Sequence, residues 1–395
     1  MHVELRRLRL DHYRNYPSLD LTLGPGMHVF AGANAQGKTN LLESVYVAAT
    51  GRSPRTNQES EMIAWDAEFA RVDGDFHSEI RGDFTVGVSL GRKAPVESAE
   101  ARRGGPVQKR IRVNDVQRSA ATLAGLVPMV LFLVEDLEIV RGEPARRRDF
   151  LDTDLSAISR TYAWALRQYT RVVEQRNRLL KDIRESSARP EDLLPWNAQL
   201  ADFGGRLLEV RTRFVHNLSA DSASTYQGLS ASPQQMSIAY LRDWGDPAET
   251  PETREDYTFL LAQALAEMEG EEIRRGSTLA GPHRDDLRFL VDSKDVRLFG
   301  SQGEQRTAAL ALRVAEFSLL HRLIGEPPVL LLDDILSELD RSRRTAMLEH
   351  LAPMAQVILT TTDVDAIGLP PNADFHLYQV SQGIVRPAGE ENSPG

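Results

Sequence analysis

The sequence predicts an α/β fold in which a discontinuous phosphate-loop core carries a small antiparallel β subdomain and a helical insertion. Three observations support this prediction. The pattern Gly-x-x-x-x-Gly-Lys-Thr occupies residues 32–39, near the N-terminus. An apolar run that ends in Asp333-Asp334 lies near the C-terminus. Between these motifs, residues 146–185 are rich in helix formers and poor in strand formers, and further helical patterns make roughly 150–275 a helical insertion.

The residues around the first motif predict a strand, a loop and a helix in succession. Residues 27–31 are apolar, and residues 39–49 carry apolar side chains at helical spacing before a glycine. Such a loop places backbone N–H groups around a phosphate at the positive end of the helix. We therefore expect ATP to contact the loop residues, which are Gly32, Ala33, Asn34, Ala35, Gln36, Gly37, Lys38, Thr39 and Asn40. A glycine-rich turn that binds nothing is the alternative interpretation.

Four side chains of the two motifs have expected roles in ATP hydrolysis. Lys38 should reach the β and γ phosphates, and the Thr39 hydroxyl should help to hold Mg²⁺. The apolar run 329–332 predicts a buried strand that delivers Asp333 to the same Mg²⁺, with Asp334 facing the γ phosphate. A simple exit from strand to loop is the alternative here. Because Lys38 and Asp333 lie 295 positions apart, the ATPase core must combine both ends of the chain.

Composition excludes several classes of protein. The chain has 395 residues and no cysteine, which predicts two or three lobes without disulfides or thiolate chemistry. No run approaches the roughly 20 apolar residues of a membrane span, and the N-terminus lacks a signal-peptide core. We therefore expect a soluble, cytoplasmic protein with no membrane partner. The net charge of −10 argues against nucleic-acid binding over the whole surface, although a local basic face is compatible with it.

The remaining patterns predict the order of elements and lobes. Strands are expected at 3–10, 19–23, 84–90, 127–134, 287–291, 329–332, 356–361 and 375–380, with a turn at 114–115. Helices are expected at 146–185, 200–214, 257–268 and 301–323, with Pro190 and Pro195 ending the first. The expected lobes are the N-terminal part of the ATPase lobe (1–145), a helical lobe (146–275), the C-terminal part of the core (276–385) and a disordered tail (386–395).

One segment is basic although the protein is acidic. Residues 92–118 hold eight lysines and arginines against three acids, a local charge of +5. This segment is the best candidate for contact with the phosphate backbone of DNA. The candidate DNA-binding residues are Arg102, Arg103, Lys109, Arg110 and Arg112. A solvated hairpin is the alternative, and the sequence favours neither.

The start of the helix expected at 301–323 has two interpretations. Ser301 and Glu304 match a capping box, in which each side chain satisfies an N–H group of the first turn. A helix N-terminus with Ser301 and Gly303 is also suited to bind an anion.

Together these residues resemble an ABC-type ATPase head, in which residues 301–306 take the place of the signature motif. In that family the signature motif of one subunit contacts the γ phosphate bound by another, which implies an ATP-dependent homodimer. Four stretches, at 14–16, 135–152, 281–284 and 332–340, carry a closer resemblance to the RecF family. Two departures are Val134, where that family usually has proline, and Glu304, where glutamine is commoner.

The resemblance to the RecF family implies a function in recombination and repair. It implies binding to double-stranded DNA next to single-stranded gaps, in an ATP-dependent way, together with RecR and RecO, to help load RecA. It also implies a weak, DNA-dependent ATPase that acts as a switch. Lys38, Asp334 and Ser301 would be its catalytic residues. Asp334 would orient or deprotonate the attacking water from a position where related ATPases often have the longer glutamate.

Three other classes compete with this interpretation. A transporter-type ATPase subunit would have a switch histidine where Thr360-Thr361-Thr362 stands. An SMC-type head would be joined to a long coiled coil, whereas residues 150–275 lack sustained heptads. A small-molecule kinase would explain the phosphate loop but would leave residues 301–306 and 337–340 without a role.

Overall fold

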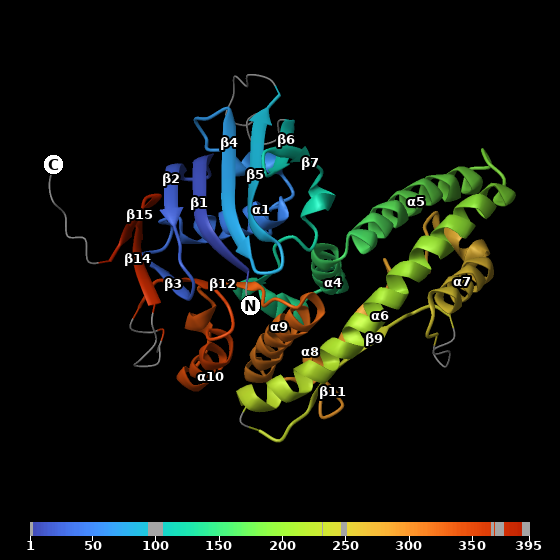
Figure 1. Ribbon diagram of the computed structural model, residues 1–395. Coiled ribbons are helices and arrows are strands. Elements are labelled where there is room, and N and C mark those ends of the chain that lie inside the picture. Colours follow the sequence, from blue (N-terminus) through green and yellow to red (C-terminus); the bar gives the residue numbers. More distant parts are fainter. Residues whose placement is uncertain are drawn as a thin grey trace. The chain divides into compact units, whose positions relative to one another are not determined.

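The computed structural model describes residues 3–93, 106–230, 232–245, 251–364, 367 and 375–388 (Figure 1). The chain divides into two compact units. The first unit comprises residues 1–136, 228–231 and 313–395, and the second comprises 137–227 and 232–312. Both ends of the chain therefore belong to the first unit, as a discontinuous core requires.

A mostly parallel sheet of the first unit carries both nucleotide motifs. Its strand order is β15-β14-β3-β13-β12-β8, and only β15 runs antiparallel to its neighbour. The bounds are β3 Met27–Ala31, β8 Met129–Phe132, β12 Val329–Asp333, β13 Val357–Thr361, β14 Phe375–Ser381 and β15 Ile384–Pro387. Strands β3, β8 and β13 are buried throughout, as expected of parallel strands covered on both faces. The N-terminal β3 lies between the C-terminal β14 and β13.

A second sheet of the first unit is antiparallel, with the order β2-β1-β4-β5-β6-β7. Its strands are β1 Val3–Tyr13, β2 Tyr16–Thr22, β4 Phe69–Ser78, β5 Gly82–Arg92, β6 Val107–Val113 and β7 Val116–Arg118. The expected turn at 114–115 joins β6 to β7, and both its residues have positive φ, which fits the right-handed twist of a hairpin. The two N-terminal strands belong to this sheet as well, so the subdomain is larger than the sequence predicted.

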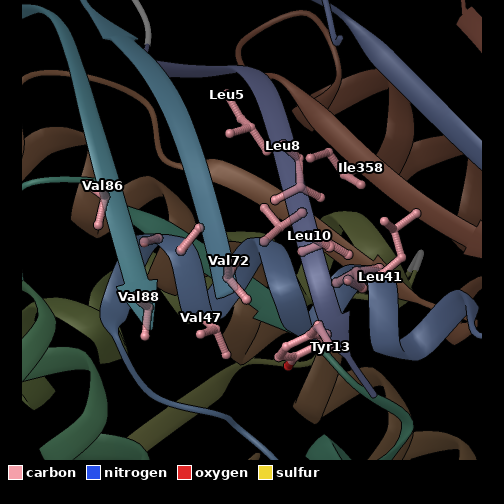
Figure 2. Close-up of a cluster of buried hydrophobic side chains, with 14 of the residues drawn as sticks. Leu5, Leu8, Leu10, Tyr13, Leu41, Val47, Val72, Val86, Val88 and Ile358 are labelled. Atoms are coloured by element: carbon pink, nitrogen blue, oxygen red, sulfur yellow. The ribbon is translucent and has the colours of Figure 1, made fainter. Parts of the chain in front are cut away.

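Helix α1 (Lys38–Thr50) contacts strands of both sheets. Figure 2 shows part of this core, with Leu8, Leu10 and Val72 of the antiparallel sheet beside Leu41 of α1 and Ile358 of β13. Nine of the thirteen residues of α1 are buried, so the helix exposes less of its surface to solvent than a typical amphipathic helix does. Because α1 is packed in this core, the C-terminal end of the phosphate loop that precedes it is held in place.

The second unit is built from helices and a small antiparallel sheet. Its helices are α3 Leu137–Arg141, α4 Pro144–Ile158, α5 Arg160–Arg184, α6 Leu194–Ser230, α7 Arg254–Arg275 and α8 Val296–Phe299. The sheet order is β11-β10-β9, with β9 Met236–Leu241, β10 Asp286–Val291 and β11 Lys294–Asp295. Helix α9 (Gln302–Ile324) begins in the second unit and ends in the first, whereas α10 (Arg341–Leu351) belongs to the first.

Several expectations about the second unit were wrong. The single helix expected at 146–185 is two helices, because Ser159 ends α4 and its hydroxyl accepts a hydrogen bond from the backbone N–H of Tyr162 (3.1 Å) at the start of α5. Pro195 does not end a helix but lies in the first turn of α6, where its missing N–H costs no hydrogen bond. Helix α6 is also much longer than expected.

Two expected boundaries differ from the structure. Residues 276–312, expected with the ATPase core, group with the second unit, where β10 pairs with β9. Their functional assignment to the core stays a prediction. Arg386 and Pro387, expected in a disordered tail, belong to β15, and residues 389–395 lie outside the described residues. No helix in the described ranges is long and apolar enough to span a membrane.

Candidate nucleotide site

Residues 32–37 connect β3 to α1, and their backbone depends on glycine. A Cβ atom at Gly32 would lie 2.3 Å from the carbonyl oxygen of Val380, which leaves no room for a side chain. Gly37 has φ 110° and Ala35 has φ 63°, both left-handed. Gly37 is the N-cap of α1 and makes no side-chain cap hydrogen bond. The N-terminus of α1 therefore keeps the arrangement that favours an anion.

Lys38 is buried at the start of α1. Its ammonium group donates to the carbonyl oxygens of Gly32 (2.7 Å) and Ala33 (3.0 Å), so the side chain lies along the loop. Burial lowers the pKa of Lys38, and the nearby carboxylates of Asp334 and Asp333 act in the opposite direction. The loop thus holds a cation beside the two acids of the second motif.

The structure brings the two distant motifs together at Thr39 and Asp333. The Thr39 hydroxyl donates to Asp333 Oδ1 at 3.1 Å, and the Thr360 hydroxyl donates to the same oxygen at 2.6 Å. Mg²⁺ prefers oxygen ligands at about 2.1 Å in an octahedron, whose neighbouring ligands lie about 3 Å apart. The Thr39 and Asp333 oxygens fit that spacing. Thr360 faces Asp333 because these residues pair in the β12–β13 register.

Asp334 has an unusual backbone conformation. Its φ of 51° lies in the left-handed region, which is uncommon for residues other than glycine. The backbone N–H of Asp334 donates to the Thr360 hydroxyl (3.0 Å), and the same N–H donates to the Thr360 carbonyl oxygen (3.3 Å). Thr360 thus holds both acids, a role that the sequence pattern did not indicate. The role of Asp334 toward water stays a prediction.

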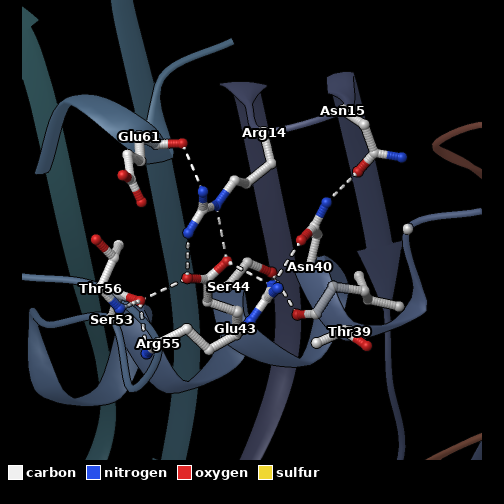
Figure 3. A network of polar contacts seen from close by, with 12 residues as sticks. Arg14, Asn15, Thr39, Asn40, Glu43, Ser44, Ser53, Arg55, Thr56 and Glu61 are labelled. Carbon is white, nitrogen blue, oxygen red and sulfur yellow. Dashed lines mark hydrogen bonds and ion pairs between the residues drawn. The ribbon is translucent and has the colours of Figure 1, made fainter. Parts of the chain in front are cut away.

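A buried ion-pair network surrounds Glu43 of α1, the helix that follows the phosphate loop (Figure 3). Arg14 donates to both carboxylate oxygens of the fully buried Glu43, at 2.7 and 2.9 Å. The Ser53 hydroxyl donates to Glu43 as well, and Arg55 lies 3.7 Å from it. The sequence held a signal for this network, because a glutamate among the apolar residues of a buried helix must have a partner.

Asn15 and Asn40 extend this network to the phosphate loop. Arg55 donates to Asn40 Oδ1 (3.0 Å), Asn40 Nδ2 donates to Asn15 Oδ1 (2.8 Å), and Asn15 Nδ2 donates to the carbonyl of Gln36 (3.2 Å). Arg14 and Asn15 carried part of the resemblance to the RecF family, but their contacts were not predicted.

The capping box expected at Ser301 is present within the second unit. The backbone N–H of Glu304 donates to Ser301 Oγ (3.2 Å), and Glu304 Oε2 accepts from both the N–H and the hydroxyl of Ser301 (2.8 Å each). A Cβ atom at Gly303 would meet only Ser301 Oγ, at 3.9 Å. The surroundings of Gly303 in its own chain therefore do not require glycine. The proposed contact of Ser301 and Gly303 with ATP of a second copy stays a prediction.

The basic segment separates into two faces of β6. Arg110 and Arg112 are exposed, whereas Lys109 is half-buried on the opposite face. Lys109 forms an ion pair with Glu59 and donates to the carbonyl of Gly51 at 3.2 Å. This difference follows from the alternation of side chains along a strand. Arg102 and Arg103 lie outside the described residues.

Two arginines of β1 in the same sheet are neutralised by carboxylates. Arg7 pairs with Asp20, and Arg9 pairs with Asp75. Among the described residues, no carboxylate lies within ion-pair distance of Arg110 or Arg112. Arg110 and Arg112 therefore keep positive charge that is neutralised at Arg7 and Arg9.

Comparison with known proteins identifies the family. The profile described as "RecF/RecN/SMC N terminal domain" matches residues 4–384. A relative from an Exiguobacterium species, named DNA replication and repair protein RecF, is 37% identical over 97% of this chain and 99% of its own length. A Bacillus cereus protein of the same name is 36% identical over 96% of this chain and 98% of its own. The chain belongs to the RecF family.

Solved structures agree with this assignment. A structure described as the recombination mediator protein RecF with ATP, in the RecFOR pathway, has a TM-score of 0.85 and 31% identity over 98% of both chains. An Smc head has a TM-score of 0.55 at 14% identity over 97% of this chain and 96% of its own, which supports the fold alone. The predicted α/β fold of an ABC-type ATPase head is confirmed. Membership of the RecF family also decides against the transporter and small-molecule kinase alternatives.

Proposed function

We propose that this RecF family member is an ATP-dependent DNA-binding recombination mediator. The observation that carries the proposal is the convergence of Lys38, Thr39 and Asp333 around one phosphate loop, although these residues come from opposite ends of the chain. A relative whose solved structure is described with ATP supports the choice of nucleotide.

The residues of the first unit have separate tasks in this proposal. The N-terminus of α1 and the loop N–H groups bind the phosphates, and Lys38 exchanges its two carbonyl partners for phosphate oxygens. Thr39 and Asp333 hold Mg²⁺, which would neutralise charge on the β and γ phosphates. Asp334 orients the attacking water. With the shorter aspartate in this place we expect slow hydrolysis, suited to a switch.

The second unit supplies the dimer contact of the proposal. Ser301 and Gly303 would contact the γ phosphate held by a second copy, so that ATP joins two chains. The room beside Gly303 supports this assignment, because a close approach needs a position without a side chain. The dimer would bind double-stranded DNA and single-strand/double-strand junctions, and would act with RecO and RecR to load RecA.

ATP binding tests the nucleotide part of the proposal. Lys38→Met should abolish ATP binding in equilibrium dialysis because it removes the side-chain cation of the loop. Lys181→Met, which removes an exposed lysine of α5, should bind ATP normally and serves as the control. Equal ATP affinity of the Lys38→Met variant and the unmodified chain would refute the assignment.

The salt dependence of DNA binding tests the basic face. Replacing Arg110 and Arg112 with alanine should reduce the slope of log K against log salt by up to about 1.8, since each lost phosphate contact contributes about 0.9. The matched control replaces Arg7 and Arg9, which lie on the same sheet but are paired with carboxylates. A lower affinity with an unchanged slope would show that Arg110 and Arg112 support the fold and do not contact DNA.

A further inference from the structure

The turn between β14 and β15 contacts the phosphate loop directly. The backbone N–H of Gln382 donates to Gln36 Oε1 (2.8 Å), and that of Gly383 donates to the backbone carbonyl of Gln36 (3.0 Å). Gln382 and Gly383 both have positive φ, 49° and 76°, which is typical of a two-residue hairpin turn. β14 pairs with β3, the strand that leads into the loop, so the sheet itself brings this turn to Gln36.

A second turn, between β1 and β2, contacts the same loop. Asn15 Nδ2 donates to the carbonyl of Gln36 (3.2 Å), and the Tyr16 hydroxyl donates to the carbonyl of Gly37 (3.0 Å). The carbonyl of Gln36 therefore accepts hydrogen bonds from two turns that come from opposite ends of the chain.

The two turns and the loop pack without space for a methyl group. A Cβ atom at Gly383 would lie 2.1 Å from the backbone oxygen of Asn15, and one at Gly37 would lie 2.4 Å from Asn15 Nδ2. The backbone oxygen of Asn15 can move only if the β1–β2 turn moves. Asn15 is thus held between Gly37 of the loop and Gly383 of the hairpin.

These contacts determine the orientation of the N–H groups in the loop. In a trans peptide, the carbonyl bond of one residue and the N–H bond of the next lie in one plane and point in opposite directions. Hydrogen bonds to the Gln36 carbonyl therefore fix the Gly37 N–H, and the bond from Tyr16 to the Gly37 carbonyl fixes the Lys38 N–H. N–H groups oriented before binding need no reorganisation when a phosphate arrives.

We propose that the β14–β15 hairpin is a latch that holds the phosphate loop in its phosphate-binding conformation, with Asn15 and Gln36 as positioning residues. This inference rests on the proposed binding of ATP to the loop. Release of the latch should weaken ATP binding while Asp333 and Asp334, which lie at the C-terminal end of β12 and have expected roles in hydrolysis, remain in place.

Gly383→Ala tests the latch, with Gly82→Ala as the matched control. Gly82 is the first residue of β5, directly after the β4–β5 hairpin turn of the first unit, and has φ 73°, but no atom beyond its chain neighbours lies within 4 Å of its Cβ position. Both variants place alanine at a similar positive φ, and only the first displaces a turn from the loop. Gly383→Ala should raise the Kd for ATP at least about fivefold, as expected when one or two hydrogen bonds are lost, whereas Gly82→Ala should leave it unchanged.

Asn15→Ala is the second variant, because it removes a donor without adding an atom. It should raise the KM for ATP and leave kcat and the stoichiometry of ATP binding unchanged. A lower stoichiometry with an unchanged Kd would mean that Asn15 supports only the fold, and it would overturn the inference. Gly383→Ala and Asn15→Ala variants that bind ATP as tightly as the unmodified chain would overturn it too. Normal ATP binding by Lys38→Met would instead refute the proposed function, and the latch with it.

Discussion

Removal of the Glu43 carboxylate should destabilise the first unit strongly. Glu43 is fully buried, and its carboxylate accepts two hydrogen bonds from Arg14 and one from Ser53 (Figure 3). Loss of one partner from a buried ion pair costs about 3–5 kcal/mol, because the other charge stays buried without compensation. Arg14 keeps a bond to the carbonyl of Glu61, and its side chain is 18% exposed. We therefore expect the lower end of that range, about 3 kcal/mol, for Glu43→Ala.

An exposed ion pair of the same unit provides the control. Arg7 and Asp20 also form a two-point pair, but their side chains are 46% and 53% exposed. Asp20→Ala should therefore cost about 0–1 kcal/mol. Native-state hydrogen exchange of peptides from β4 and β5 measures the opening free energy of the first unit separately from the second. Equal losses in the two variants would refute the reasoning, since burial is the property that distinguishes the pairs.

The remaining predictions concern turnover, dimerisation and pH. Asp333→Asn should keep much of the ATP affinity and lose Mg²⁺-dependent hydrolysis; unchanged hydrolysis would show that another residue holds the metal. Ser301→Arg should bind ATP normally but form no ATP-induced dimer in sedimentation, whereas Ser301→Asn should keep the N-cap. Burial lowers the pKa of His283 to about 4 and raises that of Asp285 to about 6. His283 binds a proton less readily in the folded unit than in the unfolded chain, so its contribution lowers the free energy of unfolding as pH falls from 6.5 to 4. Asp285 binds a proton more readily in the folded unit, so its contribution raises the free energy of unfolding as pH falls from 6 to 4. His283→Gln should therefore leave a unit that gains stability on acidification over this range, in urea titrations at several pH values.

Local patterns allowed the nucleotide motifs to be predicted from the sequence. Glycine, lysine and threonine at fixed spacing define a phosphate loop because their chemistry is local to one turn. The run before Asp333 predicts a buried strand because four consecutive apolar residues need cover on both faces. The capping box at Ser301 was equally predictable, since both its members lie within one helical turn.

Features that depend on distant partners could not be predicted in the same way. The break at Ser159 was not predicted, because Ser156 and Thr161 lie close by and only the folded chain shows that Ser159 is the residue that caps α5. Nothing near Gln36 in the sequence indicates that its carbonyl accepts hydrogen bonds from residues 15 and 383. The loop was therefore predictable as a motif, whereas the residues that hold it became visible only in the folded chain.

Strand β3 pairs with two strands from the far end of the sequence. β3 pairs on one side with β13 and on the other with β14, so both its neighbours are synthesised long after it. The side chain of Gln356 also exchanges hydrogen bonds with the backbone N–H and carbonyl of Leu5, which lies 351 positions away. Closing a chain segment of this length costs conformational entropy, and the contacts compensate for that cost only after the segment has closed. Contacts at such sequence separation therefore form slowly during folding. A chain that stopped before residue 375 would leave β3 at a sheet edge and Gln36 without Gln382 and Gly383. The phosphate loop at residues 32–39 therefore has hydrogen-bond partners in a hairpin that is synthesised long after it.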